Sequence, residues 1–310
     1  SERVSGSCPS LFAWDGQRFH FVTDAFISGP MGVPMAPGKY FPVDHDEYIR
    51  IPGEFLRADE GVLRLSITEE LREAVYLDQA RLYVLDRPAA VEVYPNEYLA
   101  PGDFPTFKLH ATEHALPPPA AFDHKGRDVL ALVSTQDRRY PSDFKKLPYA
   151  GLVEPQGVEI VLPPGAAASA NLRLFLTGWF YYFESTSLIA AAQRADLPII
   201  WPQLQVQRDG RWEKVTDIGI PPGKDKTVVI ELGGKLPLDA ERVRIWTNFE
   251  LYWDRILVDT TAQPALEGVH LLGLAGTFVV MPEQVAKPVH RQLFQLGLPA
   301  SARGAALGRL

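Results

Sequence analysis

Cysteine is almost absent from this chain of 310 residues. The single thiol, Cys8, excludes an intrachain disulfide, a zinc or redox site built on paired cysteines, and a c-type haem attachment. We therefore interpret Cys8 as a small buried hydrophobic residue. Long apolar runs are also missing: no stretch of about 18 apolar residues occurs, so we expect no transmembrane segment. The sequence starts with Ser1 and no signal-peptide pattern precedes the first strand, so we expect a processed chain or a segment of a longer protein.

Clusters of basic residues are scarce. The chain has 31 Lys and Arg against 38 Asp and Glu, which gives a net charge of −7. This balance excludes nucleic acid as an expected partner, because phosphate binding needs Lys and Arg gathered on one face. A phosphate loop, a dinucleotide fingerprint and a Gly-x-Ser-x-Gly elbow are all lacking. The sequence therefore predicts no catalytic residues, and we do not expect an enzyme.

Helical periodicity is rare, whereas turn residues are frequent. The chain holds 27 prolines and 24 glycines, and they recur about every 8–12 residues, which is typical of short strands joined by turns. Between them, apolar and polar residues alternate, as expected for strands with one buried face. The clearest cases are 19–22, 62–67, 80–85, 158–162, 172–176, 204–207, 228–232 and 243–246. The pattern predicts an all-β protein, an antiparallel β-sandwich of jelly-roll type with long Pro-rich loops and few short helices.

Local signals add detail to this prediction. The pairs Asp15-Gly16 and Asp209-Gly210 each lie between two apolar runs, which indicates tight β-hairpins. Short helices are expected at 68–78 and 187–194.

We expect three successive parts: an N-terminal hairpin and long loop (1–58) packed on the sandwich, a sandwich core (59–260), and a C-terminal strand and tail (261–310). The contact surfaces are expected in the loops at 23–58 and 100–150 and in the tail. The tail contains a strand candidate, 277–280, which is suited to completing the sheet of a neighbouring molecule.

Three segments carry a resemblance to a known group of proteins. They are Cys-Pro-Ser-Leu-Phe-Ala-Trp-Asp-Gly at 8–16, Tyr-Leu-Asp-Gln-Ala-Arg-Leu at 76–82, and Arg-Val-Arg-Ile-Trp-Thr-Asn-Phe-Glu-Leu-Tyr-Trp-Asp at 242–254. Together they resemble the β-rich region associated with TPR or FG-GAP/ASPIC-UnbV repeats in exported bacterial proteins of the cartilage-acidic-protein-like kind. The resemblance covers roughly residues 8–256 and weakens in the tail.

The resemblance implies an extracellular, periplasmic or cell-surface location and a role as a scaffold or binding protein. It offers no catalytic residue to carry over. We therefore expect a non-catalytic binding or assembly module of an exported or cell-envelope protein, with protein partners or self-assembly. It would act as a subunit of a larger complex or filament. The alternative is a carbohydrate-binding module that uses exposed aromatic residues and a structural calcium ion.

Aromatic residues gather in two places beside carboxylates. Such rings can stack on sugar rings while a carboxylate binds hydroxyls, although one side of each strand must belong to the core. The candidate ligand-binding residues are Trp179, Tyr181, Glu184, Tyr252, Trp253 and Asp254. A third possibility, a polysaccharide hydrolase, would pair Glu184 with Asp196.

Metal ligation is considered at two places. Asp44 and Asp46 would share one face of a strand and offer a hard cation such as Ca²⁺ two carboxylates; the alternative is an acidic surface turn. His110, His114 and His124 lie in a Pro-rich stretch that does not favour the helix a zinc site would use, so they are interpreted as solvated loop residues. The Lys224–Thr227 segment is a turn with a local ion pair or, alternatively, an anion site.

Overall fold

A computed structural model describes residues 9–25, 34–36, 38–41, 46–59, 62–69, 75–101, 104–183, 185–280 and 290–297. The chain forms two compact units. Unit 1 comprises Ser1–Gly6, Ser28–Tyr48 and Glu92–Pro264; unit 2 comprises Ser7–Ile27, Ile49–Val91 and Ala265–Leu310. Each unit is thus assembled from separated stretches of the chain, whereas the sequence suggested three successive parts.

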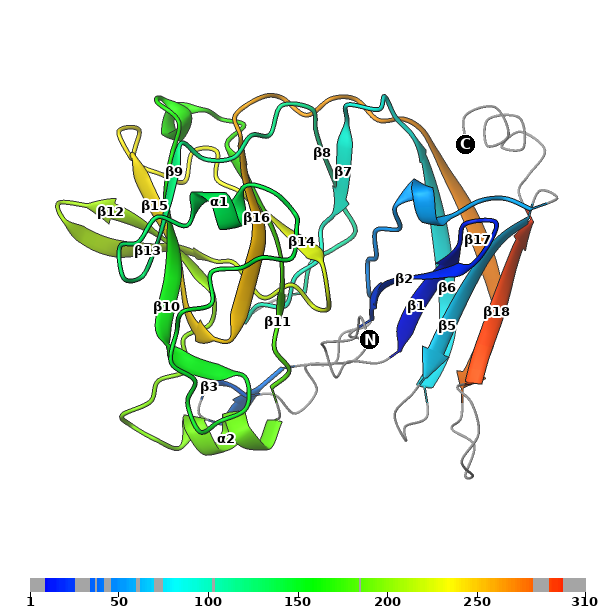
Figure 1. The fold of residues 1–310 in the computed structure, drawn as a ribbon, viewed down its shortest axis with the longest axis horizontal. Helices are drawn as coiled ribbons and strands as arrows, with labels where there is room; N and C mark the ends of the chain where they lie inside the picture. The colour runs from blue at the N-terminus through cyan, green and yellow to red at the C-terminus, as the bar shows by residue number, and fades with distance from the viewer. Residues whose placement is uncertain are drawn as a thin grey trace. The chain divides into compact units, whose positions relative to one another are not determined.

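Unit 1 is built around two antiparallel sheets, which Figure 1 shows as two layers. The five-stranded sheet has the order β13-β12-β15-β10-β9 and the three-stranded sheet the order β14-β11-β16. The strands of the first are β9 (Ala120–Asp123), β10 (Leu152–Val161), β12 (Gln203–Arg208), β13 (Arg211–Asp217) and β15 (Arg242–Phe249). Those of the second are β11 (Arg173–Phe180), β14 (Lys226–Glu231) and β16 (Leu251–Asp259). The predicted all-β, sandwich-like architecture is confirmed.

The alternation seen in the sequence explains how the five-stranded sheet faces the core. On β15, Val243 and Ile245 are fully buried, and on β12 so are Leu204 and Val206. β11 is different because every one of its residues is buried, as expected for a central strand covered on both faces. On one face, Phe175 of β11 and its register partners Val229 and Leu257 form a cluster with Tyr94, which comes from the ribbon of β7 (Glu92–Pro95) and β8 (Leu109–Thr112).

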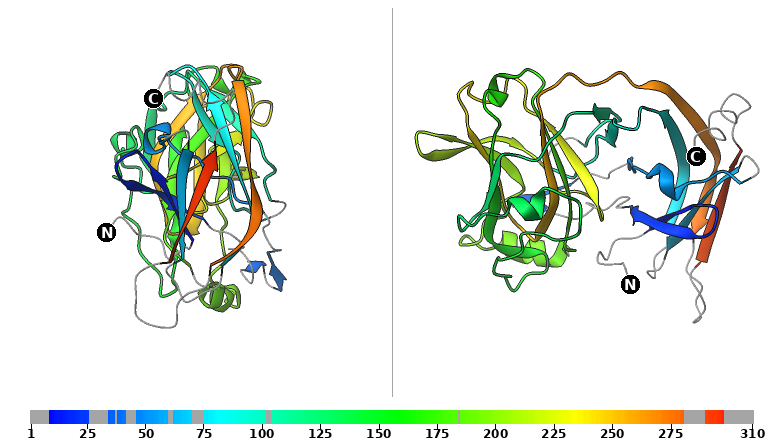
Figure 2. Two further views of the ribbon diagram at one scale, coloured as in Figure 1. Left: turned by 90° about the vertical axis from the view of Figure 1, so that its right-hand side faces the viewer. Right: turned by 45° about the horizontal axis from the view of Figure 1, so that its top comes forward.

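Smaller elements close the ends of the sandwich. The helix α2 (Ser185–Ala192) lies at one end in every view (Figures 1 and 2), and α1 (Leu130–Val133) is a single turn. Unit 1 also contains the 3-10 turn Ala166–Ala168 and the small hairpin of β3 (Pro34–Ala36) and β4 (Lys39–Tyr40), whereas the 3-10 turn Gly53–Phe55 belongs to unit 2. Phe41 follows this hairpin and packs edge-on against Trp201, whose ring lies 4.6 Å from that of Phe249.

Unit 2 combines a four-stranded sheet with a long ribbon. The sheet has the order β18-β5-β1-β2, from β1 (Ser10–Trp14), β2 (Phe19–Asp24), β5 (Val62–Glu69) and β18 (His290–Gly297). The ribbon pairs β6 (Val75–Asp86) with β17 (Glu267–Val280). Its core is a cluster of Leu11, Ala13, Leu63 and Leu65 against which Leu82 and Val84 of β6 pack. Burial of these apolar groups holds ribbon and sheet together.

Both predicted Asp-Gly hairpins are confirmed. Gly16 joins β1 to β2 with φ +98°, and Asp209 and Gly210 join β12 to β13 with φ +49° and +73°. In the second hairpin, positive φ at both central residues is the conformation that matches the twist of two-residue hairpins, whereas residues 15–18 form a four-residue loop. The helix expected at 187–194 is also confirmed in position by α2.

Other local predictions are wrong. The helix expected at 68–78 is not formed, because residues 68–69 belong to β5 and residues 75–78 to β6. The stretch 100–123 is more than a loop, since it contains β8 and β9. By contrast, the strand expected at 277–280 is confirmed as the end of β17, where it pairs with residues 75–77 of its own chain; its use by a neighbouring molecule stays a prediction. Among the described residues, no helix has the length and apolar character needed to cross a bilayer.

Candidate functional site

The outer face of the five-stranded sheet collects polar and aromatic side chains. On β15, Arg242, Arg244 and Trp246 are half-buried, whereas the residues between them point into the core. Residues opposite each other in neighbouring strands share a face, so Glu159 of β10 and Gln205 of β12, which both lie opposite Arg244, belong to this face.

At its centre, the guanidinium group of Arg244 lies between two indole rings. Its Cζ atom is 4.2 Å from the ring centre of Trp246 and 4.5 Å from that of Trp212 on β13. Arg244 reaches across β12 to Trp212, and its Nε donates a hydrogen bond of 2.6 Å to Oε1 of Gln205. We call Trp212, Arg244, Trp246 and Gln205 the Trp–Arg platform. Stacking on two indoles and one hydrogen bond fix the orientation of the guanidinium group.

A glycine makes room for this arrangement. Gly157 of β10 lies opposite Trp246. A Cβ atom on Gly157 would lie 1.9 Å from the carbonyl oxygen of Ile245 and 3.1 Å from Cε3 of Trp246. Only a residue without a side chain lets the two strands and the indole approach so closely.

The charges on this face are paired except at its centre. Arg242 forms an ion pair with Glu159, and Lys214 forms one of 2.7 Å with Asp217. Arg244 has no carboxylate within ion-pair distance in the described part of the chain. Burial lowers the pKa of Arg244, and the charge of Glu159 opposes this effect only in part. The group remains a cation whose lost hydration is incompletely replaced.

The aromatic residues singled out in the sequence form a second cluster. Trp179 of β11 and Tyr252 of β16 lie opposite each other, and their rings stack at 4.5 Å with an angle of 12°. Tyr140 meets both rings edge-on and Phe144 packs on Tyr252. Burial raises the pKa of Tyr140 to about 12. Trp179 is only 8% exposed and its neighbours cover it, so the ring stacks on protein groups.

Tyr181 is the exposed residue of this run, with 42% of its surface accessible. Nζ of Lys146 lies 5.0 Å from the centre of its ring and 2.7 Å from Oε1 of the buried Glu250. The hydroxyl of Tyr252 donates a hydrogen bond of 2.5 Å to the same carboxylate oxygen. Tyr181 is therefore partly accessible beside a paired cation and anion.

Trp253 and Asp254 are buried, and Asp254 has no exposed surface. Oδ1 of Asp254 accepts hydrogen bonds from the backbone N–H groups of Asp137 and Arg138, at 3.1 and 2.9 Å. Burial raises the pKa of Asp254; the charges of Asp225 and Asp137 add to this rise, and the two N–H donors oppose it. Asp254 thus fastens the loop at 137–138 to β16.

The structure brings Trp179, Tyr181 and Tyr252 together, while the side chains of Trp253 and Asp254 are enclosed. Glu184 and Asp44 lie outside the described residues. Asp46 is exposed, next to Glu47, which forms a buried ion pair with Lys226. Within the described ranges, no group of three or more His, Cys, Asp or Glu residues is arranged to hold a metal ion. The ligand and calcium assignments stay predictions.

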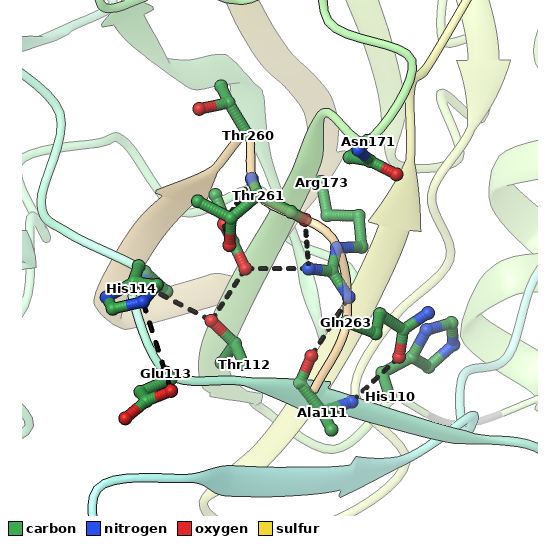
Figure 3. A network of polar contacts seen from close by, with 12 residues as sticks. His110, Ala111, Thr112, Glu113, His114, Asn171, Arg173, Thr260, Thr261 and Gln263 are labelled. Atoms are coloured by element: carbon green, nitrogen blue, oxygen red, sulfur yellow. Dashed lines mark hydrogen bonds and ion pairs between the residues drawn. The ribbon is translucent and has the colours of Figure 1, made fainter. Parts of the chain in front are cut away.

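A buried polar network fastens the segment after β16 to the sandwich (Figure 3). Nη2 of Arg173 lies 2.7 Å from Oδ2 of Asp259 and donates to the carbonyl of Thr261, while Nη1 donates to the carbonyl of Ala111. Thr112 and Thr261 donate side-chain hydrogen bonds to Asp259. Although burial acts to raise the pKa of Asp259, these hydrogen bonds and the charge of Arg173 lower it.

The three histidines considered as zinc ligands do not come together around one point. His110 lies beside this network (Figure 3), almost fully buried, whereas His114 is exposed and His124 lies 3.5 Å from Glu154. The interpretation of His110 as a solvated residue is therefore wrong. Burial lowers its pKa to about 4, with the charge of Glu231 acting in the opposite direction.

The Trp–Arg platform was not predicted from the sequence. The signal was present in part, because the alternation Arg-Val-Arg-Ile-Trp at 242–246 places both arginines and Trp246 on one face. What it could not show is that Trp212 comes to the other side of Arg244, because this depends on the order of three strands. No protein-family model matches the chain, and a search of curated protein sequences found no match.

Proposed function

We propose that this chain is a non-catalytic binding module that recognises its ligand on the outer face of the five-stranded sheet. The observation that carries the proposal is the stack of Arg244 between Trp212 and Trp246. Tryptophan and arginine dominate the energetics of many binding surfaces because they combine a large apolar area with a polar group. Here, both are held on a rigid sheet, so little conformational freedom is lost on binding.

A non-catalytic role is supported by the state of one candidate catalytic group. Asp196, which a hydrolase would use, is exposed and forms a two-pronged pair with Arg194, at 2.9 and 2.5 Å. The hydrogen bonds from Arg194 lower the pKa of Asp196. A general acid needs the opposite shift, because it must carry a proton near neutral pH.

The location is part of the proposal. The resemblance to cartilage-acidic-protein-like exported proteins supports a place at the cell surface, in the periplasm or outside the cell, where the module would be a component of a larger structure.

The proposal is tested by binding measurements on the full chain. Screening on a glycan array is followed by titration of the best ligand against Trp212→Ala, Trp246→Ala and Tyr181→Ala. We expect the first two variants to bind at least about tenfold more weakly, which corresponds to about 1.4 kcal/mol, and Tyr181→Ala to bind normally. Loss of binding in Tyr181→Ala alone would place the site at the aromatic run. A blank array would contradict a saccharide ligand.

A second function, self-assembly, is favoured by a specific observation in unit 2. The C-terminal stretch supplies β17 and β18, which pair with β6 and β5 from much earlier in the chain. Exchange of an identical element between two copies is a low-cost route to a dimer, and β17 and β18 can be exchanged together because they are neighbours in the chain. We therefore propose strand exchange, rather than addition of a free tail strand, as the mode by which copies would associate.

Exchange is tested by disulfide trapping, because deletion of 261–310 would remove two strands from unit 2. Leu271 and Tyr83 are register partners in the β17–β6 ribbon. One copy carries Leu271→Cys and another Tyr83→Cys, both with Cys8→Ser, and they are refolded together. Exchange yields a disulfide-linked pair of chains. The double-cysteine chain, which forms the bond internally, is the control; absence of linked pairs in the mixture contradicts the proposal.

A further inference from the structure

We infer that the Trp–Arg platform binds the carboxylate of an acidic saccharide, such as a chain of uronic acids. The inference rests on the proposed binding function and names its ligand class. The carboxylate would lie against the terminal nitrogens of Arg244, and the sugar ring would cover the exposed edges of the indoles.

The first argument is the unused hydrogen-bonding capacity of Arg244. Its Nε is bonded to Gln205, but Nη1 and Nη2 make no hydrogen bond to any described residue. Neither of these two nitrogens is fully buried, and the Arg244 side chain is half-buried. A guanidinium group offers two parallel N–H donors that match the spacing of carboxylate oxygens.

The charge of this face of the sheet also favours an anionic ligand. The chain as a whole has a net charge of −7, yet this face carries a positive surplus. Arg242 is neutralised by Glu159 and Lys214 by Asp217, which leaves Arg244 as the unmatched cation among the described residues of the face. An anion placed here would be attracted by a cation that forms no ion pair with a carboxylate of the described residues.

The backbone of this sheet favours a saccharide over an acidic peptide as the ligand. The backbone N–H and C=O groups of β12 and β15 are used in pairing within the sheet, so the part of the platform on these two strands offers side chains alone, whereas β13, which carries Trp212, is the edge strand. Extended peptides gain much of their affinity from backbone pairing at a sheet edge. Sugars use ring stacking and side-chain hydrogen bonds, for which the amide groups of Gln203 and Gln207 flank the platform on β12.

The test uses one sugar with and without its charge. Isothermal titration of the full chain compares a tetramer of galacturonic acid with the same tetramer as its methyl ester, in low and moderate salt. We expect the free acid to bind at least about tenfold more tightly than the ester, with a difference that shrinks in salt.

Variants assign the effect to one residue. Arg244→Gln should abolish the difference between acid and ester, and Arg244→Lys should retain only part of it, because an ammonium group cannot make two parallel hydrogen bonds. Arg208→Gln, on the neighbouring strand β12 and paired with Glu213, is the control for loss of a cation outside the platform and should bind nearly as the wild type. Circular dichroism checks that each variant is folded.

Each other outcome has a definite meaning. Equal binding of acid and ester overturns the carboxylate inference but leaves the binding proposal standing. Binding of polyglutamate instead of either tetramer overturns the saccharide assignment. If no ligand from the array or this set binds and the Trp212→Ala chain behaves as the wild type throughout, the binding proposal itself fails.

Discussion

Arg173 and Asp259 form a buried ion pair in which Nη2 lies 2.7 Å from Oδ2, at the point where the chain leaves the last strand of the sandwich. The pair is supported from both sides, since Arg173 also donates to two carbonyl groups and Asp259 accepts from two threonines. Such support is what makes a buried ion pair tolerable, because desolvation otherwise outweighs the attraction.

We predict that Arg173→Met and Asp259→Asn each lower the free energy of unfolding by about 3–5 kcal/mol. The larger loss is expected for Asp259→Asn, which leaves the guanidinium group buried without a counter-charge. Urea unfolding of the two variants and of the double variant measures the effect. The double variant should lose less than the sum of the single losses, and simple additivity would show that the two residues are not coupled.

The stability of unit 1 should depend on the protonation of His110. Its pKa of about 4 in the folded protein lies below the value of about 6.5 for an unfolded chain. Folding therefore favours the neutral ring: this contribution is fully present above pH 6.5 and is lost as the pH falls towards 4. The difference corresponds to about 3 kcal/mol.

Urea unfolding at pH 7 and pH 4.5 detects this effect, and His110→Phe should remove most of the difference between the two values. His114→Phe is the control, because His114 is exposed and its side chain lies 3.9 Å from Glu113. If His114→Phe changes the pH dependence as much as His110→Phe, burial of His110 is not its source.

Gly157→Ala is predicted to affect stability and ligand binding together. The new Cβ atom would collide with the carbonyl of Ile245 and press on Trp246, so we expect a loss of about 1–3 kcal/mol or more. Ligand titration should also show weaker binding, since Trp246 forms one side of the platform.

Gly126→Ala separates this steric effect from backbone strain. Gly126 has φ +76° and open space around it, so alanine there should cost about 1 kcal/mol and leave binding unchanged. Thermal unfolding and calorimetric titration of both variants make the comparison. A Gly157→Ala protein with normal affinity would mean that the position of Trp246 is not critical.

Asp254 should tolerate the loss of its charge but not of its acceptor. The raised pKa means that folding favours the protonated form, so this contribution is greatest at low pH and is lost as the pH rises through the folded pKa. Asp254→Asn keeps the acceptor for the N–H groups of Asp137 and Arg138, and its stability at pH 7 should equal or exceed that of the wild type.

Asp254→Ala removes the acceptor as well and should cost about 1–3 kcal/mol, because two N–H donors lose their partner. Denaturant unfolding across pH 5–8 distinguishes the two variants. Equal destabilisation of both would show that the negative charge, not the hydrogen bonds, matters at this position.

The sequence indicated the fold best where the pattern is local. Alternation at 62–67 and 243–246 and the Asp209-Gly210 turn depend on neighbouring residues, and each matches its strand or hairpin. The segment 68–78 shows the limit: its apolar spacing favours a helix. In the structure, β5 and β6 pair with β18 and β17, more distant than any local pattern can report.

The candidate site shows the same limit. A dense run of aromatic residues indicates either a ligand surface or a core, and only packing decides; Trp179 stacks on Tyr252. In the sequence, Arg244 is one polar residue of an alternating strand, and no neighbouring residue marks it as a ligand-binding group. Its importance comes from Trp212, which is brought beside it by a strand order that places β12 between them.

The pairing of β17 with β6 and of β18 with β5 also determines when unit 2 can fold during synthesis of the chain. The ribosome makes β5 and β6 early, but their partners emerge only after the whole of Glu92–Pro264 has been synthesised. Until then, edges of these strands lack their final neighbours and invite pairing with other chains. We therefore expect the sheet and ribbon of unit 2 to be completed only after Glu92–Pro264 has been made, and to form slowly, because long-range strand pairing requires closing very large loops.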